Sequence, residues 1–149
     1  MIVKSLEHLN QISKSISKKL VNGDCIFLIG EIGVGKTTFT RFLINNLQNQ
    51  KGLKETEVLS PTFNLLYEYE IKDLKIMHYD LYRIKKTNEL DHLGIFSENE
   101  KTIKIIEWPQ LIDIPLSDKL EIHLDYIKNE KEREIKFIGS GKWKTLNQL

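Results

Sequence analysis

The first twenty residues alternate apolar and polar positions with the period of an amphipathic helix. Ser5 stands where a helix N-cap is expected, and Asn22-Gly23-Asp24 follows the last apolar position. The apolar residues that repeat at this spacing are Leu6, Leu9, Ile12, Ile16 and Leu20. We therefore predict a helix over the first twenty residues, with one face packed on a core.

The next segment changes from a wholly apolar run to helical spacing. Residues 25–29 (Cys-Ile-Phe-Leu-Ile) are apolar throughout, which is typical of a strand buried on both faces of a parallel sheet. Glycines interrupt the pattern over residues 30–35, and helical spacing returns from Lys36. The buried positions expected on this second helix are Phe39, Phe42, Leu43 and Leu47. The pattern therefore predicts a strand, a glycine-rich loop and a helix in direct succession.

The remainder of the chain reads mainly as strands. We expect strands over 64–71, 74–79, 102–106, 119–127 and 133–138, with a short helix over 87–93. Lys72 and Asp73 form a hairpin turn between the first two, and the last two form an antiparallel pair. Residues 1–149 are thus expected to form one α/β domain, with a mostly parallel core sheet and additional antiparallel strands.

Composition narrows the class of protein. Hydrophobic residues make up 40% of the chain, charged residues 29%, and the net charge is +1, which argues against a large nucleic-acid-binding surface. No apolar run approaches the length of a membrane span, so we expect a soluble, cytoplasmic protein with no membrane partner. Cys25 is the only cysteine and lies in an apolar run, which favours a buried thiol in a reducing compartment.

The glycine-rich loop carries the strongest chemical signal in the chain. Gly30-x-x-x-x-Gly35-Lys36-Thr37 fits the P-loop pattern, in which backbone N–H groups and a helix N-terminus cradle phosphates. Lys36 is expected to reach the β- and γ-phosphates and to act in catalysis, and the Thr37 hydroxyl to bind Mg²⁺. The nucleotide contacts expected here are Gly30, Ile32, Gly33, Val34, Gly35, Lys36, Thr37 and Thr38. The fold class expected is therefore a P-loop NTPase.

Two acids stand where a second magnesium ligand is expected, at the carboxyl ends of predicted strands. Glu107 follows the more apolar strand, so we prefer it as the metal-side acid. Asp80 could orient or deprotonate the attacking water, or hold a metal-bound water. Thr62, after the rigid Pro61, is a candidate sensor of the γ-phosphate. Trp108 is either a packing brace or a partner anchor.

Three classes of P-loop enzyme compete. A GTPase should carry an Asn-Lys-x-Asp motif, and the chain has none. A small-molecule kinase normally has a lid with several arginines, whereas Arg41, Arg83 and Arg133 are the only arginines and lie far apart in sequence. The third class is an ATPase whose turnover drives or resets a partner protein.

A resemblance favours the third class. The chain resembles the TsaE family, the bacterial ATPase of tRNA N6-threonylcarbamoyladenosine biosynthesis, nearly end to end. The motifs that carry the resemblance are 30–39, Ser60-Pro61-Thr62-Phe63, His78-Tyr79-Asp80-Leu81-Tyr82-Arg83, Glu107-Trp108-Pro109 and 121–126. Glu31 and Val34 depart from the residues usual in the family, both at positions where the backbone makes the contact.

The resemblance implies a site and a set of partners. The expected cofactors are ATP and Mg²⁺, the latter held by Thr37 and Glu107, with Ser60 to Thr62 as a switch-like loop and with Asp80 and Trp108 tied to activity. The resemblance places the adenine pocket near the N-terminal helix and the C-terminal hairpin, and the candidates there are Ser5, Leu6 and Lys131. TsaB-like and TsaD-like proteins are the expected partners. TsaD modifies adenosine 37 of tRNAs reading ANN codons, and ATP hydrolysis resets the complex, so tRNA is contacted only indirectly. A small-molecule kinase is the alternative.

Overall fold

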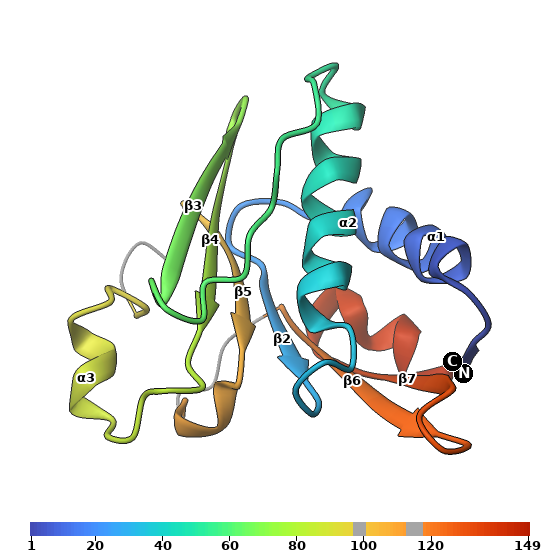
Figure 1. The fold of residues 1–149 in the computed structure, drawn as a ribbon. Helices are drawn as coiled ribbons and strands as arrows, with labels where there is room; N and C mark the ends of the chain where they lie inside the picture. The colour runs from blue at the N-terminus through green and yellow to red at the C-terminus, as the bar shows by residue number, and fades with distance from the viewer. Residues whose placement is uncertain (97–100, 113–117) are drawn as a thin grey trace.

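The computed structural model describes residues 1–96, 101–112 and 118–149. Within these residues the chain forms one mixed sheet of seven strands in the order β1-β7-β6-β2-β5-β4-β3 (Figure 1). The strands are β1 Ile2–Val3, β2 Cys25–Ile29, β3 Leu66–Ile71, β4 Leu74–Asp80, β5 Ile103–Glu107, β6 Lys119–Ile127 and β7 Glu132–Gly139. The helices are α1 Leu6–Ser17, α2 Lys36–Gln50 and α3 Asn88–Asp91, with 3-10 turns η1 Pro109–Leu111 and η2 Gly141–Gln148.

The centre of the sheet is parallel and its edges are antiparallel. β2 pairs in parallel with both β5 and β6, and β4 pairs in parallel with β5. β3, β7 and β1 are added antiparallel, to β4, β6 and β7 respectively. The parallel strands therefore all end at one edge of the sheet, the edge from which the loop to α2 departs (Figure 1).

Helices α1 and α2 cover one face of the sheet, as Figure 1 shows. The larger apolar cluster joins Phe39 and Leu43 of α2 to Ile26 and Leu28 of β2 and to Trp143 of η2. A second cluster lies on the opposite face, where Cys25, Phe27 and Tyr79 pack against residues that follow β4. β2 is consequently buried on both faces, as its apolar run predicts.

The predicted elements are largely confirmed, with changes at their ends. Ser5 caps α1 through a hydrogen bond that its hydroxyl accepts from the His8 amide at 3.0 Å. Cys25 is buried, with 4% of its surface exposed. α1 ends at Ser17 instead of near residue 20, and α3 spans four residues where seven were expected. β3 begins at Leu66 because the preceding Leu65 adopts a left-handed conformation (φ 68°) that interrupts a strand.

Three elements were not predicted: β1, η1 and η2. β1 is too short to show any periodicity, and its pairing with Arg133 and Glu134 joins segments about 130 residues apart. η2 follows β7, and its Trp143 indole N–H donates to the Asp118 carbonyl at 3.2 Å. Among the described residues, no helix is long and apolar enough to cross a membrane.

Candidate nucleotide-binding site

The loop between β2 and α2 has the backbone geometry that its glycines permit. Gly33 and Gly35 adopt positive φ angles of 79° and 124°, which other residues rarely tolerate. Gly30 is required for a different reason, because a Cβ there would lie 2.5 Å from the Leu124 carbonyl oxygen of β6. α2 then begins at Lys36, so the free N–H groups of its first turn face the same loop.

Side chains of the β6–β7 hairpin hold this loop in place through hydrogen bonds to its carbonyl groups. The Tyr126 hydroxyl donates to the Ile32 carbonyl at 3.2 Å, and Arg133 Nε donates to the Val34 carbonyl at 3.0 Å. The Arg133 guanidinium also lies 4.2 Å from the centre of the Tyr126 ring. The sequence did not predict either hydrogen bond, because the bonded residues lie 94 and 99 positions apart.

Lys36 folds back over the loop. Its ammonium donates to the carbonyls of Gly30 and Glu31, the latter at 3.1 Å, and lies 4.1 Å from the centre of the Trp108 ring. Burial lowers the Lys36 pKa below its ordinary value, while the nearby carboxylates of Glu107 and Asp80 act in the opposite direction. The Lys36 ammonium is therefore placed to neutralise a phosphate bound in the loop.

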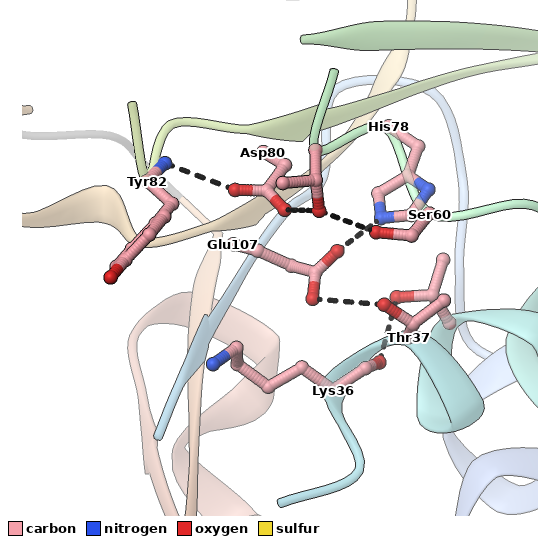
Figure 2. Close-up of polar contacts among 9 residues, drawn as sticks. Lys36, Thr37, Ser60, His78, Asp80, Tyr82 and Glu107 are labelled. Atoms are coloured by element: carbon pink, nitrogen blue, oxygen red, sulfur yellow. Dashed lines mark hydrogen bonds and ion pairs between the residues drawn. The ribbon is translucent and has the colours of Figure 1, made fainter. Parts of the chain in front are cut away.

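Glu107 contacts the first turn of α2. Its Oε1 accepts a hydrogen bond from the Thr37 hydroxyl at 3.3 Å, and its Oε2 lies 2.8 Å from His78 Nε2 (Figure 2). Only 2% of Glu107 is exposed. The predicted metal pair, Thr37 and Glu107, is therefore brought into contact, and His78 is a neighbour that sequence analysis did not assign. Its place on β4 two residues before Asp80, and so on the same face, was the available signal.

Asp80 lies opposite Glu107 in the register of β4 and β5 but has different contacts. One oxygen accepts a hydrogen bond from the Tyr82 amide at 3.0 Å (Figure 2). The other accepts one from the Thr62 hydroxyl at 2.8 Å. Ser60 extends this chain, with its hydroxyl 2.7 Å from that of Thr62. Thr62 and Asp80, predicted separately, thus form one unit in which Asp80 anchors the loop that contains Thr62.

Two neighbouring cavities flank the glycine-rich loop. The first, about 190 Å³, is lined by Ile32, Gly33, Gly35, Lys36, Thr37, Thr38, Asp80, Glu107 and Trp108. The second, about 330 Å³, shares Gly33, Gly35 and Thr38 with the first and is lined by Ser5, Leu6 and Lys131 as well. The candidate adenine residues and the candidate phosphate residues therefore open onto adjoining cavities. Thr62 lines neither cavity and reaches the first through Asp80.

Trp108 joins the two sides of the first cavity. It adopts a left-handed conformation (φ 59°) between β5 and η1, and its ring centre lies 4.8 Å from that of Tyr82. The same ring contacts the Lys36 ammonium. Of the two roles predicted for Trp108, the packing contact is present, and a contact with a partner protein stays a prediction.

These features together define a P-loop α/β fold. The centre of the sheet is parallel, a glycine-rich loop leads into a helix, and a lysine, a threonine and an acid meet at the strand ends. The crystal structure of Bacillus subtilis YdiB has a similar fold, with a TM-score of 0.73 and 26% identity; the match covers 99% of this chain and 90% of that one. A family model described as threonylcarbamoyl adenosine biosynthesis protein TsaE matches residues 3–135, and the chain belongs to this family.

Relatives from several bacteria carry the same description, tRNA threonylcarbamoyladenosine biosynthesis protein TsaE. The Rickettsia felis protein is 33% identical over 132 residues, which cover 88% of this chain and 75% of the relative. The Haemophilus influenzae protein is 34% identical, over 74% of this chain and 68% of the relative. The Bacillus subtilis protein is 32% identical, over 91% and 82% respectively. The family resemblance inferred from the motifs is confirmed.

Proposed function

We propose that this chain is a Mg²⁺-dependent ATPase that serves tRNA threonylcarbamoyladenosine biosynthesis together with TsaB-like and TsaD-like partners. The observation that carries the proposal is the meeting of Lys36, Thr37 and Glu107 at one cavity beside the glycine-rich loop. These three side chains supply the charges and oxygen ligands that a triphosphate with magnesium needs. A cytoplasmic location and indirect contact with tRNA belong to the same proposal.

The residues present fit a magnesium ion. The Thr37 hydroxyl and a Glu107 carboxylate oxygen are both hard oxygen donors, and they already lie in contact at 3.3 Å. Mg²⁺ usually takes one or two protein oxygens and completes its coordination with phosphate and water. When bound, the ion would neutralise charge that develops on the β- and γ-phosphates.

The protein's own groups would position the substrate. Lys36 can exchange its contacts with the Gly30 and Glu31 carbonyls for phosphate oxygens, because its side chain is long and flexible. Backbone N–H groups of the loop and of the α2 first turn would bind the remaining phosphate oxygens. Asp80 and Thr62 would orient the attacking water, Asp80 by accepting its hydrogen bond and Thr62 by moving with its loop.

The second cavity is the candidate site for the nucleoside. Leu6 is 65% exposed and lines this cavity, so its side chain could offer an apolar surface to the base. Ser5 and Lys131 lie on opposite elements around the same cavity and could contact the ribose or the base edge. The two cavities share three residues of the loop, so one nucleotide could place its phosphates in the first cavity and its nucleoside in the second.

The contacts of the arginines weigh against a small-molecule kinase, the alternative function. Arg133 is engaged by the Val34 carbonyl and the Tyr126 ring, Arg83 lies over the Phe63 ring and Arg41 over the Phe42 ring. None of the three lines the first cavity as formed by the described residues. Kinases of this type usually close several arginines on the transferred phosphate.

The test is ATP turnover by the purified chain, alone and with TsaB-like and TsaD-like proteins. We expect slow hydrolysis alone and faster hydrolysis in the mixture. Lys36→Ala should abolish nucleotide binding or turnover, and Glu107→Ala should reduce Mg²⁺-dependent turnover more than ADP affinity. Unchanged turnover in the full mixture would contradict the partner role. If Asp80→Ala instead alters the Mg²⁺ dependence and Glu107→Ala does not, the roles of the two acids should be exchanged.

A further inference from the structure

His78 is a fully buried polar side chain beside the candidate magnesium ligand. It lies on β4, with 0% of its surface exposed, and its Nε2 is 2.8 Å from Glu107 Oε2. Figure 2 shows the imidazole ring of His78 directed at one oxygen of the carboxylate and the Thr37 hydroxyl at the other. Glu107 is therefore held between two partners, one on each oxygen.

The surroundings of the ring determine which nitrogen donates. His78 Nδ1 is buried and has no hydrogen-bond partner among the residues that the structure describes. A proton on Nδ1 alone would leave the Nε2 lone pair facing a carboxylate oxygen, which is repulsive. Nε2 therefore carries a proton, and His78 donates to Oε2 of Glu107.

This hydrogen bond separates the roles of the two carboxylate oxygens. Oε2 is engaged by His78, whereas Oε1 points to the Thr37 hydroxyl and the first cavity. We propose that His78 is a positioning residue, which fixes the rotation of the Glu107 carboxylate so that Oε1 faces Mg²⁺. The inference rests on the proposed function, because it assigns a role toward the magnesium that ATP would bring.

A purely structural role does not account for this residue. His78 follows Ile76 on the same face of β4 and pairs in register with Ile105 of β5, so an apolar side chain would suit the position. A buried nitrogen without a partner lowers stability. The one polar contact that the ring makes within the described residues is with the carboxylate at the site.

Substitutions of His78 by amide side chains of different length test the proposal. His78→Gln places an amide nitrogen near the position of Nε2, whereas His78→Asn has the same polarity and is too short to reach Glu107. The first measurement is ADP binding by calorimetry across a Mg²⁺ titration, with ADP affinity in EDTA and thermal unfolding measured beside it. We expect His78→Asn to raise the Mg²⁺ midpoint about 10- to 100-fold and leave the affinity in EDTA unchanged. His78→Gln should restore most of the loss.

His123 offers a matched control. It forms a similar pair with Glu121, at 3.1 Å, on β6 and away from both cavities that flank the loop. His123→Asn should therefore leave the Mg²⁺ midpoint unchanged. If His78→Asn does not fold, His78→Met carries the same expectation as an apolar replacement of similar size.

The outcomes separate this inference from the proposed function. If wild-type protein binds ADP with a clear Mg²⁺ dependence and His78→Asn or His78→Met has the same midpoint, the positioning role is overturned while the proposed function stands. If His78→Asn and His78→Gln weaken binding equally with and without Mg²⁺, the residue is structural and the inference is also overturned. A wild-type protein with neither Mg²⁺ dependence nor ATP turnover contradicts the proposed function itself and removes the basis of this inference.

Discussion

Replacing Gly30 by alanine tests whether the phosphate loop depends on close contact with β6. The backbone of Gly30 does not need a glycine conformation, but an added Cβ would lie 2.5 Å from the Leu124 carbonyl oxygen and 2.7 Å from a Val34 methyl group. Ordinary contacts begin at 3.4 Å, so the carbonyl contact is too short by about 0.9 Å. The Leu124 oxygen belongs to a strand paired on both sides, and the loop must therefore move instead.

The size of the effect follows from the cost of overpacking. Forcing an extra methyl group into a filled site typically costs about 1–3 kcal/mol, which corresponds to about a 5- to 150-fold loss of affinity if the loop displacement opposes nucleotide binding alone. ADP binding by calorimetry measures the loss, and thermal unfolding measures any shared loss of stability. Adding Val34→Ala should restore only part of the affinity, because it removes one of the two clashes.

Gly52→Ala is the matched control. Gly52 follows the far end of α2, has a positive φ of 72° and has open space where a Cβ would stand. It should lower stability modestly through backbone strain and leave ADP affinity intact. The reasoning would be refuted if Gly30→Ala bound ADP as well as the wild type, or if Gly52→Ala lost affinity to the same extent.

Three further predictions concern other parts of the molecule. Arg133→Lys keeps the charge but loses the Nε–H that donates to the Val34 carbonyl, so the affinities for ATP and ADP should both fall by about 3- to 10-fold in calorimetry. A loss of affinity for ATP alone would instead place the guanidinium at the γ-phosphate. Thr62→Val breaks the bond to Asp80 and should lower the rate of ATP hydrolysis about 10- to 100-fold at constant ADP affinity, and a normal rate would exclude this loop from catalysis. Burial raises the pKa of the Cys25 thiol to about 12, so a disulfide reagent at pH 8 should modify the folded chain far more slowly than the urea-unfolded chain. The unfolded thiol loses its proton near its ordinary pKa of 9.0, whereas the folded thiol keeps it, so the stability that this group contributes is complete below pH 9 and falls as the pH rises towards 12. Cys25→Ala should therefore reduce the fall of the free energy of unfolding with pH in this range, measured by urea titration. An unchanged pH dependence would contradict the raised pKa.

The sequence predicts the individual helices and strands of this fold better than it predicts which strands pair with each other. β2 and α2 are recognised because apolar spacing and glycine position are local signals, and the same holds for the Ser5 cap. The order of the strands depends on contacts between distant segments, such as the pairing of β2 with β5 and β6. No local pattern reports such pairings, which is also why β1 was missed.

The same division holds for the site. Lys36, Thr37 and Glu107 could be named in advance because a loop motif and strand ends fix their positions within a known arrangement. The hydrogen bond from Thr62 to Asp80 could not, since it depends on how a loop without regular structure returns to the sheet. Tyr126 was likewise hidden, because its hydroxyl acts on a carbonyl that the sequence does not distinguish from any other.

The position of β2 at the centre of the sheet has a consequence for synthesis of the chain. β2 and the loop after it emerge from a ribosome long before residues 103–107 and 119–123, which supply both of its parallel neighbours. Until then this apolar strand has no partner and the loop has neither the β6 carbonyl beneath it nor the hairpin outside it. Strands that pair across such distances form late in folding. A chain that stopped before residue 119 would therefore carry the whole glycine-rich motif and yet bind no nucleotide.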